Sequence, residues 1–266
     1  MDFYSIASGS SGNCIYIGTD QCSVLIDAGI SCKRITDALR DIGRSVQDLT
    51  AILVTHEHSD HIAGLGVLSR KAHIPVYATA GTIRQILRYS PLGNVEEELF
   101  HPIDADRPFQ VGDMMVEAFH TSHDAAEPVA YRIESGGKAA GVATDMGCFN
   151  RYTVNHLRDL DVLLIEANHD ENMLQAGPYP YPLKRRIMGE KGHLSNLSSA
   201  MLLSQILNDH MNTVYLGHLS KTNNYADLAY ATVISELAMD PNCPYREGDI
   251  PIRVASREHP MEMLSF

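Results

Sequence analysis

The run Thr55-His56-Glu57-His58-Ser59-Asp60-His61 holds three imidazoles and the carboxylate of Asp60 within six positions, from His56 to His61. It directly follows an apolar, strand-like segment, Ala51-Ile52-Leu53-Val54. Imidazole and carboxylate groups are the usual protein ligands of hydrolytic divalent ions. We interpret the run as a metal site at the end of a strand, since the alternative, a solvated turn that is merely rich in histidine, rarely gathers such groups.

The spacing within the run indicates more than one ion. His56 and His58 are two positions apart, so in an extended backbone their side chains point the same way. Asp60 and His61 fall where the chain should enter a helix, and they can reach a different ion. One short loop can therefore supply ligands to two neighbouring metals.

Length and composition favour one globular domain spanning residues 1–266. The chain has 266 residues, of which 44% are hydrophobic, enough for a large core. No apolar run approaches the roughly twenty residues of a membrane span, and the start of the sequence has no signal-peptide pattern. Five cysteines without a CxxC pair fit a reducing compartment, so we expect a cytoplasmic protein without a membrane partner. Cys148 is expected to be a buried core residue.

The net charge of −12 argues against a broad surface for nucleic acid, because that mode of binding needs a basic face. A local basic strip nevertheless occurs at Lys184-Arg185-Arg186, with Lys191 just beyond it. The strip could bind phosphate groups or be an ordinary solvated helix face.

Alternating apolar strands and amphipathic helices predict the α/β class. A hairpin signal at Ser135-Gly136-Gly137 lies in a mostly extended region from 100 to 145, which implies a second sheet. Residues 177–182, rich in proline, are expected to form a stiff surface loop. The expected strands are 3–7, 14–18, 22–27, 51–55, 75–78, 114–121, 129–134, 138–144, 162–166 and 213–216, and the expected helices are 31–42, 60–72, 79–89, 151–160, 194–208 and 225–239.

Four further polar residues lie where an expected strand gives way to a loop, a place from which rigid elements aim side chains into a shared site. They are Asp27, His123, Asp145 and His218. Each alone could be structural, but with the dense histidine run they indicate one metal site. The other histidines are expected to be structural or exposed, with His120 and His169 the two that merit attention.

Taken in order, Asp27, the His56–His61 run, His123, Asp145 and His218 resemble the five motifs of the metallo-β-lactamase superfamily. The resemblance implies an αββα sandwich with two divalent ions, zinc or manganese, with iron also able to bind. It implies that His56, His58 and His123 hold the first ion, that Asp60, His61 and His218 hold the second, that Asp145 bridges them, and that Asp27 orients the ligand loop by hydrogen bonds.

Asp145 narrows the chemistry. A bridging carboxylate brings two ions to roughly 3.5–4 Å, which suits hydrolysis of a phosphodiester or ester. Zinc β-lactamases resemble this pattern without a bridging carboxylate at that position, so we do not expect antibiotic hydrolysis. The motifs therefore favour another hydrolase of the superfamily.

A later segment, Lys191-Gly192-His193-Leu194-Ser195-Asn196, resembles the late histidine motif of RNase Z and RNase J. The resemblance implies that His193 contacts the scissile phosphate or assists the leaving group. Glu166 would support His193 or the metal ligands, and Ser195, Asn196 and the helix start would bind phosphate.

The resemblance is closer to the bacterial WalJ (YycJ) proteins, through segments 8–13, 55–61, 161–170, 183–196 and 216–224. It implies a metal-dependent nuclease with 5′-to-3′ exonuclease activity, acting on DNA rather than RNA. In the Gly/Ser run, Ser10, Ser11 and Asn13 could offer amides to a phosphate or form a tight turn between strands.

We predict that a metal-bridging hydroxide attacks the phosphodiester, with Asp60 orienting this nucleophile and His193 protonating the leaving oxygen. Lys184, Arg185, Arg186 and Lys191 would guide the nucleic-acid backbone. Two alternatives remain at this point: a hydrolase of small phosphodiesters or thioesters, and a non-catalytic regulatory partner protein. The sequence gives no expectation for the oligomeric state.

Overall fold

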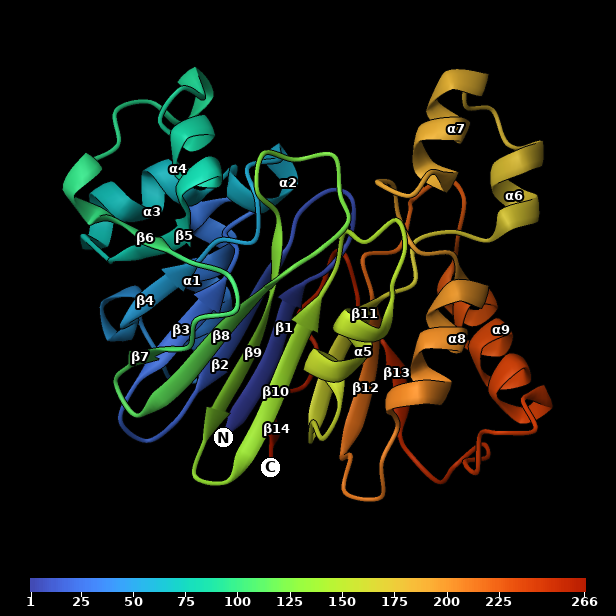
Figure 1. Ribbon diagram of the computed structural model, residues 1–266. Helices are drawn as coiled ribbons and strands as arrows, with labels where there is room; N and C mark the ends of the chain where they lie inside the picture. The colour runs from blue at the N-terminus through green and yellow to red at the C-terminus, as the bar shows by residue number, and fades with distance from the viewer. The chain divides into compact units, whose positions relative to one another are not determined.

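The computed structural model describes all residues from Met1 to Phe266, and they form two compact units. Unit 1 contains Met1–His120, Ala125–Lys138 and Ser256–Phe266, and unit 2 contains Thr121–Asp124 and Ala139–Ala255 (Figure 1). The expectation of a single domain stays a prediction.

Unit 1 contains a seven-stranded sheet whose strands follow the order β14-β1-β2-β3-β4-β5-β6. The pairs β14–β1, β1–β2 and β2–β3 are antiparallel, and the pairs from β3 to β6 are parallel. The strands are β1 (Asp2–Ala7), β2 (Cys14–Gly18), β3 (Ser23–Ile26), β4 (Ala51–Leu53), β5 (Val76–Thr79), β6 (Phe100–Ile103) and β14 (Leu264–Ser265).

Three antiparallel strands of unit 1 form a further layer: β7 (Phe109–Val111), β8 (Met114–His120) and β9 (Val129–Ser135). Tyr131 on β9 is buried, and its hydroxyl donates a hydrogen bond to the carbonyl oxygen of Val54 at 2.9 Å. The amide of Val129 donates to the carbonyl of Thr55 at 3.0 Å. These bonds fix the chain directly before the His56–His61 run.

The helices of unit 1 follow the strands of its large sheet and are short. They are α1 (Cys32–Asp41), α2 (Ser59–Ile62), α3 (Leu65–Ala72) and α4 (Ala80–Ile86), with the 3-10 helices η1 (Val46–Asp48), η2 (Ser90–Leu92) and η3 (Glu97–Leu99). The Ser31 side chain caps α1, which buries Ile35 and Leu39 in the core.

One continuous helix over 60–72 was expected, and that prediction is wrong in detail. The chain breaks between α2 and α3 at Gly64, whose amide donates to the carbonyl of Ala28 at 2.8 Å. A Cβ at this glycine would lie 2.0 Å from the carbonyl oxygen of Ile30, so only glycine permits this approach. The break holds the start of α2, with Asp60 and His61, against the loop after β3.

Unit 2 is built on parallel strands that pair in the order β10-β11-β12-β13. Because parallel strands end at the same edge, the residues that follow β10, β11 and β12 meet there. The strands are β10 (Lys138–Ala143), β11 (Val162–Glu166), β12 (Thr213–Gly217) and β13 (Ile252–Val254), and the helices are α5 (Arg151–Leu157), α6 (Glu171–Ala176), α7 (Tyr181–Met188), α8 (Asn196–Ile206) and α9 (Ala226–Met239).

Several local features differ from expectation. Helices α6 and α7 and strands β6, β7, β13 and β14 were not predicted individually, and α7 begins inside the proline-rich stretch that was expected to be a loop. Pro182 is compatible with this helix because it lies in the first turn, where its missing N–H is not needed. Cys148 is exposed, so the expectation of a buried residue is wrong. No helix is both long and apolar enough to cross a membrane.

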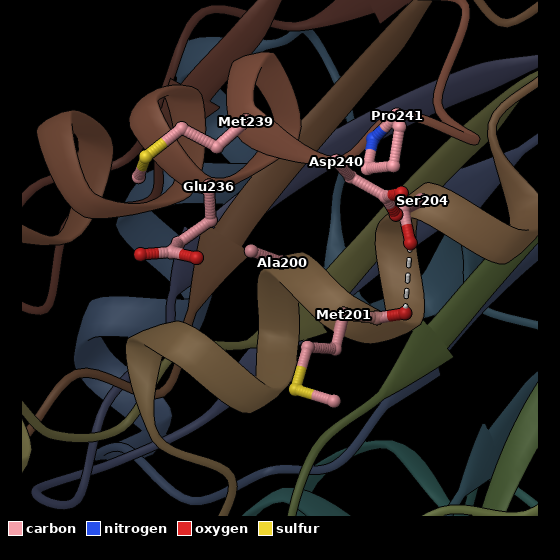
Figure 2. A pocket seen from close by; sticks show the side chains of 7 residues that line it. All are labelled: Ala200, Met201, Ser204, Glu236, Met239, Asp240 and Pro241. Atoms are coloured by element: carbon pink, nitrogen blue, oxygen red, sulfur yellow. Dashed lines mark hydrogen bonds between the residues drawn. The ribbon is translucent and has the colours of Figure 1, made fainter.

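Helices α8 and α9 lie side by side in unit 2, with a hollow of about 290 Å³ between them (Figure 2). It is lined by Ala200, Met201, Ser204, Glu236, Met239, Asp240 and Pro241. None of these is a predicted site residue, and the hollow holds no histidine or cysteine. The hollow is therefore not the predicted metal site.

Candidate metal centre

In unit 1, Asp27 organises the histidine loop. Its Oδ1 accepts a hydrogen bond from the Thr55 amide at 2.8 Å, and its Oδ2 accepts from the Thr55 hydroxyl at 2.8 Å. The Nδ1 atom of His61 lies 2.7 Å from the same Oδ2. Because a carboxylate only accepts, His61 carries its proton on Nδ1 and presents the lone pair of Nε2.

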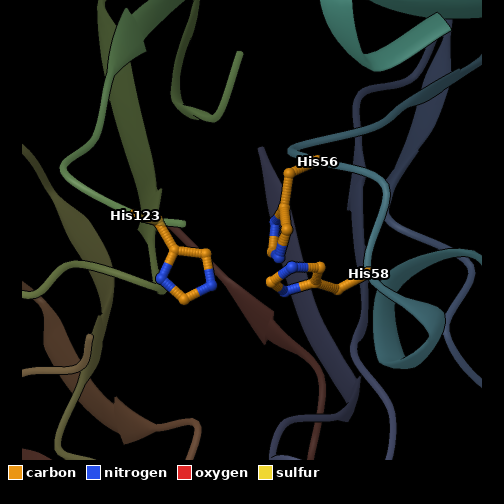
Figure 3. Close-up of side chains that lie close together, drawn as sticks. All are labelled: His56, His58 and His123. Carbon is orange, nitrogen blue, oxygen red and sulfur yellow. The ribbon is translucent and has the colours of Figure 1, made fainter. Parts of the chain in front are cut away.

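The first two histidines of the run lie together. The ring centroids of His56 and His58 are 4.6 Å apart with the planes at 75°, and Nδ1 of His56 lies 3.1 Å from the Thr55 hydroxyl. Figure 3 shows these two rings edge to face, and it also draws His123, a residue of unit 2. His56 is almost fully buried, whereas His58 is partly exposed. Both therefore come from one rigid loop with the geometry of a ligand pair.

Asp60 begins α2 next to these imidazoles. Its Oδ2 lies 3.6 Å from Nε2 of His61, and its side chain is 23% exposed. Its carbonyl oxygen accepts from the Asn13 amide at 2.8 Å. A Cβ on Gly29 would lie only 1.7 Å from that oxygen, so the glycine after β3 lets the two loops touch.

The Gly/Ser run divides into an exposed and a buried part. Ser10 and Ser11 are exposed at a turn. Asn13 is buried, where its Oδ1 accepts from the Gly9 amide at 2.9 Å and its Nδ2 lies 3.1 Å from Nε2 of His61. Asn13 thus lies beside a predicted ligand, and Ser10 and Ser11 remain open to solvent.

In unit 2, a second group gathers at the carboxyl ends of the parallel strands. Asp145, Glu166, His193 and His218 each offer one ligand atom, and these atoms lie within 4.8 Å of one another. Oε1 of Glu166 lies 2.8 Å from Nδ1 of both His193 and His218, so one carboxylate oxygen accepts from two imidazoles. Its Oε2 accepts from the amides of Met146 and Leu194 at 2.9 and 3.1 Å.

Glu166 and His193 each stabilise the charged form of the other. Burial raises the pKa of Glu166, but the charges and hydrogen bonds of His193 and His218 outweigh it and lower the pKa to about 2. Burial lowers the pKa of His193, yet the adjacent Glu166 carboxylate raises it above its usual value overall. Glu166 is therefore a carboxylate that accepts from Nδ1 of both rings and fixes their orientation.

His123 belongs to the same unit. Its Nδ1 lies 3.0 Å from the carbonyl oxygen of Gly192, and its Nε2 lies 3.5 Å from Oδ1 of Asp145. A carbonyl can only accept, so His123 also carries its proton on Nδ1. Gly192 precedes His193, which ties the two histidine segments of unit 2 together.

The backbone is strained at three of the predicted site residues. Asp27, Asp145 and His218 have φ angles of 61°, 59° and 55°, in the left-handed region. Each of them follows a strand, either directly or after one intervening residue. Residues other than glycine adopt this backbone conformation at a cost of about 1–3 kcal/mol. Such strain at three ends of strands is typical of a functional site.

The donor set fits divalent metal ions. In His61, His123 and His218, Nδ1 faces an oxygen acceptor, so Nε2 is the ring nitrogen that can coordinate an ion. In His61 this nitrogen also lies 3.1 Å from Nδ2 of Asn13. Metal-binding histidines in proteins are commonly held in this way by a carboxylate or carbonyl. Asp145 and Asp60 add carboxylate oxygens, and no thiolate takes part. The set suits zinc, manganese or iron.

The predicted phosphate-binding residues near α8 make internal hydrogen bonds. The Ser195 hydroxyl caps α8 through the Ser198 amide at 3.1 Å and donates to Glu171 at 2.9 Å. Asn196 is buried and exchanges hydrogen bonds with the Asn224 side chain at 2.8 and 3.2 Å. Their role in phosphate binding stays a prediction, and the structure gives both a second role in holding the start of α8.

The basic strip lies on α7. Lys184 donates to the Gln175 carbonyl at 2.6 Å, and Arg186 forms two hydrogen bonds with Asp124, one of them at 2.9 Å. Arg185 is exposed. The structure places the strip on a helix that the sequence had not predicted, and its contact with nucleic acid stays a prediction.

Three residues at these groups were not assigned a role from the sequence. Thr55 joins Asp27 to the histidine loop, Asp124 holds Arg186, and His169 is buried with no hydrogen-bond partner at Nδ1. Burial lowers the pKa of His169 to about 4. Thr55 and Asp124 could have been identified from the sequence, because each is adjacent to a predicted ligand. His120 is exposed.

Comparisons with known proteins show the family of the chain. The profile of the family described as Beta-lactamase superfamily domain matches residues 23–218. The chain is 42% identical over 236 residues to exodeoxyribonuclease WalJ of Streptococcus pneumoniae, and 38% identical over 241 residues to exodeoxyribonuclease YycJ of Bacillus anthracis; each match covers 88% of both chains. The crystal structure of the metallo-β-lactamase fold protein YhfI from Bacillus subtilis matches with a TM-score of 0.69 at 15% identity, covering 98% of this chain and 99% of that one.

The fold is that of the metallo-β-lactamase class. The chain belongs to the β-lactamase superfamily and, within it, to the family of WalJ and YycJ. The fold class predicted from the sequence, an αββα metallo-β-lactamase sandwich, is confirmed. So is the predicted family.

Proposed function

We propose that this protein is a metal-dependent hydrolase of nucleic acid, a 5′-to-3′ exodeoxyribonuclease. The observation that carries the proposal is the 42% identity to an exodeoxyribonuclease over 88% of both chains. The imidazole and carboxylate groups of the two units support it, because they are the ligands that metal-dependent phosphodiester hydrolysis requires. The five cysteines are free, which suits a cytoplasmic protein.

The ligands of the proposed dinuclear centre follow the order of the motifs along the chain. In this proposal His56, His58 and His123 would hold one ion, Asp60, His61 and His218 would hold the second, and Asp145 would be shared between them. Zinc or manganese is the proposed metal, since both accept this mixture of imidazole and carboxylate ligands. The order of the motifs along the chain and the single tautomer of His61, His123 and His218 support this assignment.

When bound, the ions would supply a nucleophilic water at neutral pH and neutralise charge on the phosphate. The remaining steps fall to side chains of this chain. Asp60, partly exposed beside His61, orients the attacking water, and Asp27 holds His61 through Nδ1. His193 donates a proton to the leaving oxygen, and Glu166 fixes its ring and favours its protonated form.

The DNA backbone is proposed to follow the basic strip of α7 into this site. Arg185 offers an exposed cation, and Lys191 lies two residues before His193. Such a local strip can bind phosphates even though the chain carries a net charge of −12. Ser10 and Ser11, exposed on the loop before Asn13, are proposed as further phosphate contacts.

The test is cleavage of DNA labelled at either end, as duplex and single strand, and of RNA, with manganese or zinc. We expect the label at a 5′ end to be released as short products first. The double variant Asp60→Ala with His61→Ala should lose this cleavage. The control is Asp209→Ala with His210→Ala, an adjacent Asp-His pair on the turn after α8.

The results of this experiment distinguish a metal nuclease from a hydrolase of small phosphodiesters. Loss of cleavage in the first variant but not in the control supports a metal nuclease. If the wild type leaves every polymer intact with both ions yet hydrolyses bis-p-nitrophenyl phosphate, the protein is a hydrolase of small phosphodiesters and the nuclease proposal is wrong.

A further inference from the structure

Helix α7 presents an aromatic, a cationic and an apolar side chain to solvent on one face. Tyr181, Arg185 and Met188 are spaced by four and three residues, so they lie along the same side of the helix. Tyr181 is 70% exposed and Met188 is 43% exposed, and Arg185 is exposed as well. An aromatic ring, a cation and a thioether therefore lie next to one another on one exposed side of α7.

The other two cations of the strip hold the helix in place. Lys184 donates to the carbonyl of Gln175, which ties α7 to α6, and Arg186 pairs with Asp124. No hydrogen bond or ion pair joins the exposed side chain of Arg185 to another residue. Arg185 is therefore the cation of α7 that remains available to a phosphate group.

This face is connected directly to the segment of His193. The His193 amide donates to the carbonyl of Ile187 on α7 at 2.9 Å, and the buried side chain of Ile187 anchors the helix. Asp124, the partner of Arg186, is itself fixed, because its backbone amide donates to the Lys191 carbonyl at 3.1 Å. Figure 1 shows α6 and α7 as a pair of short helices at one end of unit 2. Whatever binds α7 is thus held at a fixed place relative to His193.

We propose that the outer face of α7 binds unpaired nucleotides of the strand being degraded, with Tyr181 stacking on a base and Arg185 binding a phosphate. This inference rests on the proposed function. An exposed tyrosine ring can stack on an unpaired base, whereas the bases of a duplex are already stacked on one another. A single free cation beside the ring matches one phosphate of a single strand in charge, while a duplex surface would call for a broader basic face.

The test is binding of a phosphorothioate single strand of deoxythymidine, which resists cleavage, to the metal-loaded protein, measured by fluorescence anisotropy. We expect Tyr181→Ala to weaken binding about tenfold, and Tyr181→Phe to stay within about twofold because the ring is kept. Arg185→Ala should lower the slope of affinity against salt by roughly 0.7. The matched control is Tyr225→Ala, another tyrosine, 55% exposed, directly before α9.

The results test whether Tyr181 stacks on an unpaired base. If Tyr181→Ala binds the single strand as well as the wild type, or weakens binding to a blunt duplex equally, the inference is wrong, even where the wild type cleaves DNA. Hydrolysis of bis-p-nitrophenyl phosphate should be unchanged in Tyr181→Ala. A wild type that hydrolyses this small substrate but neither binds nor cleaves any polymer overturns the proposed function and the inference together.

Discussion

The Nδ1 atom of His193 lies 2.8 Å from Oε1 of Glu166, and both groups are shielded from solvent. The same oxygen lies 2.8 Å from Nδ1 of His218. One carboxylate therefore fixes the proposed proton donor and a proposed metal ligand at once. Its other oxygen is taken up by the amides of Met146 and Leu194, so all four hydrogen bonds run toward the carboxylate.

Glu166→Gln should disrupt this arrangement although the side chain keeps its shape. An amide has one acceptor oxygen, so its NH₂ group must face either the two imidazoles or the two backbone amides, all of which are donors. We expect DNA cleavage to fall about 10- to 100-fold, with a loss of bound metal. Turnover and metal content measured on the same sample check this. Glu236→Gln, in the hollow between α8 and α9, is the control, and equal activity in both variants would contradict the assigned role of Glu166.

Asp27→Asn tests the histidine loop. Asparagine tolerates the left-handed backbone found at Asp27, where φ is 61°, so the change removes charge and one acceptor without adding strain. Asp27 accepts from the Thr55 amide, the Thr55 hydroxyl and His61, and a broken buried network of this kind costs about 3 kcal/mol. Urea unfolding of metal-free protein should register that loss, and metal analysis of loaded protein should show less bound ion. An unfolding free energy equal to that of the wild type would argue against Asp27 as the organiser of the loop.

The main elements of the fold could be predicted because they are set by local apolar pattern. Strand β11 was expected at 162–166 and is observed at Val162–Glu166, where every residue is buried. The continuous apolar run of a strand covered on both faces leaves little ambiguity. The residues that follow such strands could be read as site candidates for the same reason.

What the sequence did not reveal depends on contacts between distant segments. The break at Gly64 follows from the close approach of Ile30, and the helix α7 overrides the loop signal of Gly177-Pro178-Tyr179-Pro180 because Pro182 falls in its first turn. The sequence predicted that Glu166 supports either His193 or the metal ligands, but not that one carboxylate oxygen contacts both His193 and His218. Its two bonds depend on where β11, β12 and the segment before α8 end in space.

His169 should make the unfolding free energy depend on pH. Burial lowers its pKa in the folded protein to about 4, against 6.5 for an ordinary histidine. Above pH 6.5 the residue is neutral in both states. As the pH falls from 6.5 toward 4, the unfolded chain binds a proton that the folded chain does not, so stability is lost, by up to about 3 kcal/mol.

Urea unfolding at pH 7 and pH 4 measures this effect in the wild type and in His169→Gln, which cannot titrate. The variant should lose less stability over that range. His210→Gln, at an exposed histidine, should behave as the wild type does. If the wild type and His169→Gln lose the same free energy, burial of a neutral His169 makes no contribution.

The hydroxyl of Tyr131 gives a prediction that depends on neither metal nor substrate. It donates to the carbonyl oxygen of Val54 at 2.9 Å inside the core of unit 1, directly before the histidine loop. Tyr131→Phe leaves that carbonyl without this donor, at a cost of about 1–2 kcal/mol. Tyr230→Phe is the matched control, because the Tyr230 hydroxyl donates to Glu247 at 3.2 Å in an exposed position, where water replaces the lost bond and the cost should stay below about 0.5 kcal/mol. Thermal or urea unfolding of the two variants should therefore differ, and equal losses would mean that the Tyr131 bond does not stabilise the strand end that carries the ligands.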